Sequence, residues 1–402
     1  MATSSFSVVA SHVWLGGTFR PARVGVRDGV ISEVVPLSSR YLPVGPPGDV
    51  GGEVYRLPED TVLLPGLVDL RVAVGEPRRA DGDALRSATL AAAGGGVTTI
   101  VDMSLNSLPP TTTPEALRAT RKAAGRNAFV DVGHWARAVP GNLGSLAALR
   151  QAGVFGFACF LSPAVADESP RLDVEQMRRA MTEVAALGSR LIVSADPLAV
   201  ETVIEAVRDT NCRTHLPRLI DGNALSAIRL AKREGFPLSV DTRARHLSPV
   251  ADETPDGADN RDLLWRGLLD GTIDAITNAG AEGLPTGLSA VWTEAKRRRI
   301  PLSTILPLFT TGTATVGGLS GAGEIAVGRS ANLTVFGPDR PMLPVAEKGE
   351  SRARVGSPDG RVLTGRFLHT WLHGATVFDA TEGQAHAPSS RRTPRGQVLS
   401  AT

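Results

Sequence analysis

Short apolar runs alternate with longer stretches of helical periodicity between Leu64 and Thr315, and no other feature of the sequence limits the fold as much. This alternation predicts repeated βαβ units, because parallel strands need a crossover connection that is usually a helix. Eight candidate strands lie at 67–71, 97–103, 128–133, 154–160, 190–195, 213–219, 237–242 and 272–278. Eight such units in about 250 residues predict a TIM (β/α)8 barrel of the α/β class.

The segments on both sides of the barrel have the short β-rich runs and the Gly and Pro punctuation of antiparallel structure. Asp28-Gly29 stands between two such runs and predicts a tight hairpin turn. We expect one small β domain built jointly from residues 1–64 and 316–385, beside a barrel domain over 65–315. Residues 386–402 are rich in Ser, Arg and Pro and are expected to form a disordered tail.

The composition of the 402 residues excludes several classes of function. A net charge of +2 gives no reason to expect nucleic acid or a membrane surface as a partner. Two cysteines without a C-x-x-C pattern argue against a disulfide framework and against a cysteine zinc site. The chain lacks an apolar run of about 20 residues and a signal-peptide pattern, so the cytoplasm is the expected location.

Several long motifs carry a family resemblance. The stretch 65–73, Pro-Gly-Leu-Val-Asp-Leu-Arg-Val-Ala, is similar to the Pro-Gly-x-x-Asp-x-His-x-His opening of cyclic amidohydrolases. Further matching motifs lie at 94–113, 129–133, 138–142, 153–163 and 287–295. From about residue 60 to 380 the chain resembles the allantoinase branch of the amidohydrolase superfamily, which also includes dihydroorotases and hydantoinases. The resemblance implies the same barrel and small β domain.

The resemblance also implies a site for two metals, held by the His-x-His pair, a carboxylated lysine, two further histidines and an aspartate. At each of these positions the chain has another residue type: Arg71, Ala73, Ala158, Ser194, Arg218 and Ala279. No lysine lies in any candidate barrel strand. Without metal, a bound water stays weakly acidic and the amide is not polarised. The sequence therefore predicts no metal, no other cofactor and the loss of metal-dependent catalysis.

Three positions of the chain where histidines stand in relatives are Arg71, Arg218 and Arg245. If these side chains converge, they form a cationic pocket for a carboxylate or phosphate. Alternatively each pairs with an acid and fills the space that the metals would take, because an unpaired buried charge is costly. Asn106 and His134 are further candidates for ligand contacts, although turn geometry for Asn106 and a stacking or capping role for His134 are the favoured explanations.

These observations lead to the prediction of a non-catalytic allantoinase-like subunit or scaffold. It would form homo-oligomers or bind an active amidohydrolase or another metabolic enzyme, and whether the chain is an enzyme at all is left open. A first alternative is a binder or sensor of a small anionic ureide-like metabolite. Others are a metal-independent enzyme with an arginine-lined pocket, and a residual cyclic amide hydrolase.

Overall fold

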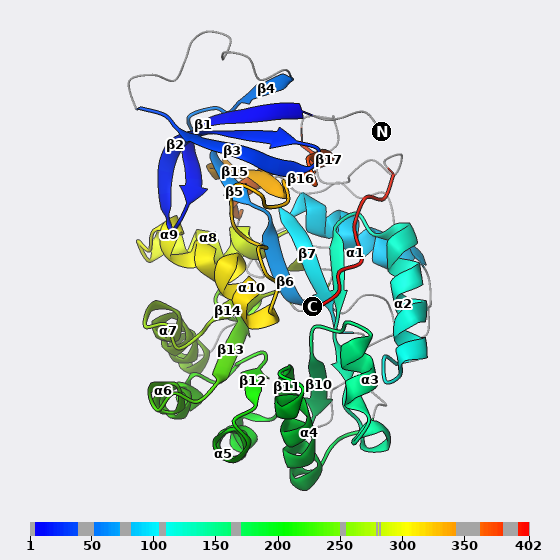
Figure 1. Cartoon of the computed structure of the whole chain (residues 1–402). Coiled ribbons are helices and arrows are strands. Elements are labelled where there is room, and N and C mark those ends of the chain that lie inside the picture. Colours follow the sequence, from blue (N-terminus) through cyan, green and yellow to red (C-terminus); the bar gives the residue numbers. More distant parts are fainter. Residues whose placement is uncertain are drawn as a thin grey trace.

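The computed structural model describes residues 5–38, 52–72, 82–103, 110–161, 170–249, 255–278, 280, 283–342, 362–380 and 393–401. Figure 1 shows a ring of strands surrounded by helices, with a sheet from both ends of the chain lying beside it. The ring carries the candidate site, and the sheet closes one side of it.

Eight parallel strands form the TIM barrel that the alternating pattern predicted. They are β6 (Leu67–Val72), β7 (Val97–Asp102), β8 (Asp131–His134), β10 (Phe157–Phe160), β11 (Arg190–Ser194), β12 (Arg213–Leu216), β13 (Leu238–Arg243) and β14 (Ala275–Thr277). Hydrogen bonding joins β6, β7 and β8 into one arc and β10 to β14 into another, with the two-residue strand β9 (Ala136–Arg137) beside β10. The expected and observed strands differ at their ends by up to three residues.

Two hydrogen bonds connect the arcs into a ring. On one side the backbone N–H of Phe155 donates to the carbonyl of His134 over 3.1 Å. On the other, the N–H of Asn278, directly after β14, donates to the Asp69 carboxylate over 2.8 Å. The second contact brings the first and last strands together at the mouth of the barrel.

Helices surround the ring (Figure 1). They are α1 (Gly82–Gly94), α2 (Pro114–Asn127), α3 (Leu146–Gln151), α4 (Val174–Ala186), α5 (Val200–Thr210), α6 (Leu225–Arg233), α7 (Pro255–Leu269), α8 (Gly287–Arg297), α9 (Leu302–Ile305) and α10 (Thr311–Gly317). Helix α4 begins at an Asp173 and Gln176 capping box, which satisfies two backbone N–H groups. Its buried residues Met177, Met181 and Val184 recur at helical spacing and face the strands.

Strand alternation separates the two faces of β10. Cys159 packs in the main core together with Met177 of α4, so its side chain faces the helices. Its neighbour Ala158 belongs to a different apolar cluster, with Trp135 and Ile192. Because successive side chains point to opposite faces of a strand, Ala158 faces the inside of the barrel.

The small β domain is an eight-stranded sheet that takes strands from both ends of the chain. Its order is β17-β16-β15-β5-β1-β2-β3, with β4 paired to β1. The bounds are β1 (Ser5–Leu15), β2 (Thr18–Arg27), β3 (Val30–Pro36), β4 (Glu53–Arg56), β5 (Val62–Pro65), β15 (Leu333–Pro341), β16 (Thr364–Leu372) and β17 (Ala375–Asp379). The β2–β3 turn has Asp28 and Gly29 at φ 52° and 79°, the left-handed pair that a tight hairpin requires.

The C-terminal segment 393–401, hereafter the C-terminal strap, differs from the expected disordered tail, whose other residues, 386–392 and 402, lie outside the described residues. It is extended and pairs in parallel with β8 through Val398 and Val132. The N–H groups of Gly396, Leu399 and Ala401 donate to barrel carbonyls over 2.9 to 3.0 Å. Composition indicated disorder, but β8 offers unpaired backbone groups at its start, and the strap satisfies them.

Candidate active site at the mouth of the barrel

Four arginines lie at or just beyond the C-terminal ends of barrel strands, hereafter the arginine cluster. Arg71 is near the end of β6, Arg218 follows β12, Arg243 ends β13, and Arg245 lies in the 3-10 turn η4 (Ala244–His246). TIM-barrel enzymes build their active sites on this face, from the loops that follow the strands. The structure therefore brings together the three arginines singled out from the sequence and adds Arg243.

Arg71 is the innermost member of the arginine cluster, with 6% of the residue exposed. Burial lowers the pKa of Arg71, as do the charges of Arg218 and Arg245, while Asp241 and Asp69 raise it. Its Nε and Nη1 atoms are buried and have no hydrogen-bond partner among the described residues. A buried guanidinium with unused donors is costly, so this site favours an acceptor that approaches from the mouth.

The remaining arginines form a path from the barrel interior to the surface. Arg218 and Arg243 are half-buried, and Arg245 is exposed. Burial and the neighbouring charges of Arg71, Arg245 and Arg218 lower the pKa of Arg243 to about 9. Sequence reasoning missed Arg243, although its position two residues after Asp241 in one strand places both on the same face.

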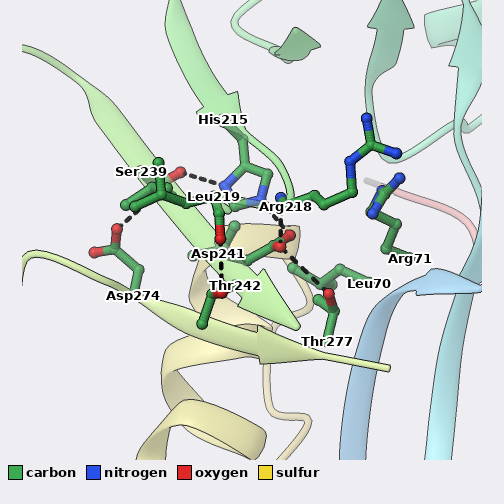
Figure 2. A network of polar contacts seen from close by, with 12 residues as sticks. Leu70, Arg71, His215, Arg218, Leu219, Ser239, Asp241, Thr242, Asp274 and Thr277 are labelled. Carbon is green, nitrogen blue, oxygen red and sulfur yellow. Dashed lines mark hydrogen bonds and ion pairs between the residues drawn. The ribbon is translucent and has the colours of Figure 1, made fainter. Parts of the chain in front are cut away.

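A buried network lies just below the arginine cluster (Figure 2). His215 Nε2 lies 2.9 Å from Asp241 Oδ2, and His215 Nδ1 lies 2.9 Å from Ser239 Oγ. The other oxygen of Asp241 accepts the backbone N–H of Arg218 at 2.8 Å and lies 3.3 Å from Thr277 Oγ1. Burial alone would raise the pKa of Asp241, but the hydrogen bond and charge of His215, with Arg71 and the Arg218 N–H, lower it below its usual range.

Asp69 is the second carboxylate beside Arg71. One oxygen accepts the backbone N–H of Arg71 and the other that of Asn278, each over 2.8 Å. Burial raises the pKa of Asp69 to about 6, and these two N–H groups only partly offset that effect. Asp69 is therefore a stronger base than an ordinary carboxylate, and it lies close to the arginine cluster.

Two further positions that the resemblance assigned to metal ligands lie on the barrel strands. Ala158 is fully buried in the apolar cluster with Trp135 and Ile192. Trp135 is held there by a hydrogen bond from its Nε1 to the Leu70 carbonyl at 2.8 Å. Ser194 ends β11 and is 9% exposed. Apolar side chains thus surround the position at which the resemblance implied a lysine.

His134, a candidate ligand contact, lies away from the arginine cluster. It ends β8 and is almost fully buried, with Nδ1 3.8 Å from Asp102 Oδ2. Its neighbour Gly133 faces Phe155 and Val101, which belong to the same apolar cluster as Ala158 inside the barrel. Because successive side chains on a strand point to opposite faces, the His134 side chain points outward, toward the helices. Ala73, Asn106 and Ala279 lie outside the described residues.

The described residues do not fit a two-metal centre. Metal sites need imidazole, thiolate or carboxylate groups that converge on one point. Within the described ranges, no three His, Cys, Asp or Glu side chains are grouped closely enough to hold an ion. Arg71 and Arg218 would moreover place positive charge beside any cation.

These features define a TIM barrel with a charged cluster at its catalytic face and a sheet from both chain ends. The chain belongs to the amidohydrolase family, whose sequence profile matches residues 62–366. An allantoinase from Streptomyces avermitilis is 36% identical and aligns with 95% of this chain and 95% of its own length. The mitochondrial allantoinase of Aquarana catesbeiana is 31% identical, over 79% of this chain and 76% of its own length.

Solved structures agree with this assignment at the level of the fold. The L-hydantoinase from Arthrobacter aurescens superposes with a TM-score of 0.83 at 20% identity, covering 99% of this chain and all of that one. The dihydropyrimidinase from Brevibacillus agri reaches 0.80 at 19% identity, with 99% of each chain covered. Both confirm the predicted α/β class with a barrel and a small β domain.

The comparisons correct the prediction of a non-catalytic subunit. Relatives that match nearly the whole chain are named as allantoinases, which indicates an active cyclic amidohydrolase rather than a scaffold. The prediction rested only on the residue types at the expected metal-ligand positions. Residue types at a few positions do not by themselves decide whether a chain is catalytic, because other groups can also stabilise developing negative charge.

A membrane-spanning segment is not found among the helices that the structure describes, none of which combines the length and apolarity needed to cross a bilayer.

Proposed function

We propose that the chain hydrolyses a cyclic amide of the allantoin or hydantoin type at the mouth of the barrel. The observation that carries this proposal is the 36% identity to the Streptomyces avermitilis allantoinase over 95% of both chains. A substrate ring would enter beside the arginine cluster, at the C-terminal ends of the strands.

The chemistry of the reaction suits this cluster. Water adds to a ring carbonyl carbon, the C–N bond breaks, and the ring opens to a carboxylate while the leaving nitrogen takes up a proton. Negative charge develops on the carbonyl oxygen during the addition, where the unused donors of Arg71 and the side chain of Arg218 would stabilise it. Water must lose a proton, and Asp69, with a pKa of about 6, is a base of suitable strength beside them.

The test is ring opening by the purified full chain with allantoin, hydantoin and dihydrouracil, followed by chromatography of the ring-opened products. At least one ring should open, and Arg71→Gln should reduce kcat/KM by about 100-fold, the typical cost of one oxyanion donor. Arg118→Gln is the matched control, because Arg118 is exposed and pairs with Glu115 on α2. If a folded sample opens none of the three rings, the proposal is overturned.

Two expectations from the sequence stay predictions. The resemblance favours a homo-oligomer, or a complex with another amidohydrolase, in the cytoplasm. Light scattering after gel filtration of the purified chain measures its mass in solution. A mass of 42.1 kDa would contradict the homo-oligomer.

A further inference from the structure

We propose that Arg71, Arg218 and Arg243 form a carboxylate-binding site at the mouth of the barrel. The inference rests on the proposed function and deepens it. It assigns a class of ligand to the site, either a ring substrate that carries a carboxylate or the carboxylate that ring opening creates.

The first observation is the unsatisfied guanidinium of Arg71. Its Nε and Nη1 atoms are buried and lack hydrogen-bond partners within the part of the chain that the structure describes. Figure 2 shows the Arg71 and Arg218 side chains extending to the same side of the His215–Asp241 pair. The charge of Arg218 acts directly on Arg71, so the two cations are close together.

The second observation is that the nearby acids are already bound to other groups. Asp241 is held by His215, by the Arg218 backbone N–H and by Thr277. Asp69 accepts backbone N–H groups with both of its oxygens. The sequence left open whether the arginines pair with acids and fill the centre. In the structure, the hydrogen bonds of Asp69 and Asp241 go to backbone N–H groups, His215 and Thr277 rather than to the arginine side chains.

The third observation is the gradient of exposure across the arginine cluster. Arg71 is buried, Arg218 and Arg243 are half-buried, and Arg245 is exposed. An anion that approaches from solvent would therefore meet positive charge from the surface to the innermost guanidinium. A cluster that served only to fill the barrel would not need a charged path outward.

A carboxylate is the anion that fits both the residues and the reaction. Its two oxygens match the planar fork of a guanidinium, which binds carboxylates through two parallel hydrogen bonds. Opening of a cyclic amide always produces a carboxylate at the reacting carbon. The site would thus select an anionic ring, hold the ring-opened product, or do both.

The experiment measures binding by isothermal titration calorimetry to the purified full chain, without any need for turnover. Three probes separate the sources of the carboxylate: hydantoin is neutral, hydantoin-5-acetate is an anionic ring, and N-carbamoylglycine is a ring-opened product. We expect one or both carboxylates to bind at least about 10-fold more tightly than hydantoin. Tight binding of the anionic ring assigns the site to the substrate, and tight binding of N-carbamoylglycine alone assigns it to the product.

Variants connect the binding to the arginines. Arg71→Gln should weaken carboxylate binding about 10-fold or more, Arg71→Lys should restore only part of it because the fork is lost, and Arg118→Gln should leave it unchanged. Arg218→Gln provides a second test at a less buried position if Arg71→Gln does not fold. Equal affinity for hydantoin and both carboxylates, or unchanged binding in folded Arg71→Gln and Arg218→Gln, would overturn the site.

The binding and hydrolysis measurements together distinguish a failure of the carboxylate site from a failure of the hydrolase activity. Binding of carboxylates without hydrolysis of any ring supports the site and refutes the hydrolase. Hydrolysis of neutral rings without preferential carboxylate binding supports the hydrolase and refutes the site.

Discussion

Inside the barrel, Nε2 of His215 lies 2.9 Å from the Oδ2 atom of Asp241, on the neighbouring strand. Both side chains are almost fully buried. The contact supports the arginine cluster from below, because Asp241 also accepts the backbone N–H of Arg218. Arg218 has a φ of 59°, an uncommon conformation for a residue with a side chain, and this hydrogen bond helps to hold it.

Removal of His215 should be strongly destabilising. His215→Ala leaves the Asp241 carboxylate buried without its main partner, and such a loss costs about 3 to 5 kcal/mol. Urea unfolding measures the change in free energy, with exposed His12→Ala as the control. A loss below about 1 kcal/mol would show that the pair is not an important contact.

Ser239 should contribute much less than His215. Ser239→Ala removes one hydrogen bond to His215 Nδ1 and leaves the contact with Asp241 in place. The expected cost is about 1 kcal/mol, that of a typical hydrogen bond between side chains. In urea unfolding, the midpoint of Ser239→Ala should lie closer to that of the unmodified protein than the midpoint of His215→Ala does.

The C-terminal strap should stabilise the barrel. A Cβ at Gly396 would lie 2.0 Å from the Val130 carbonyl oxygen, so Gly396→Ala must displace the strap. We expect a loss of about 1 to 3 kcal/mol, as for other overpacked positions. Gly141→Ala is the matched control, since a Cβ there meets no atom within 4 Å. Thermal unfolding that is the same for both variants would contradict a stabilising strap.

His246 should report the positive charge of the arginine cluster. Burial, together with Arg245 and Arg243, lowers the pKa of His246 to about 4. The unfolded chain takes up this proton below about pH 6.5, so the contribution of His246 to stability is present above that pH and is lost as the pH falls toward 4. An NMR titration of the ring should give a pKa well below 6.5. In His246→Gln the loss of stability over this range should be smaller.

A lysine at position 158 should not recreate a metal centre. The Ala158 side chain packs against Trp135 and Ile192, so Ala158→Lys overpacks this cluster and buries an amine. We expect a loss of about 3 kcal/mol or more, with no recovery when zinc is added. Ala158→Ser is the small-residue control. Zinc-dependent recovery of the melting temperature in Ala158→Lys would show that the remaining residues do hold metal.

The mouth of the barrel shows how far the sequence alone could lead. Periodicity predicted the strands, and Arg71, Arg218 and Arg245 were identified as a group because a resemblance assigned them to one site. Arg243 and the bonds of Asp241 were missed, because hydrogen bonds between neighbouring strands depend on register and side-chain rotamers. The composition of the C-terminal strap indicated disorder. Composition does not reveal that β8 has backbone groups with which the strap pairs.

The sequence by itself determined the barrel and the β segments at both ends. These features depend on the local periodicity of apolar residues and on linear motifs, and both can be read from one amino-acid sequence. Only the tertiary structure decided that Asp241 bonds to His215 and that Nε and Nη1 of Arg71 have no hydrogen-bond partner among the described residues. Pairing between charged groups is a matter of distance and desolvation. His215 and Asp241 are 26 positions apart on neighbouring strands, and they acquire both only when the barrel forms.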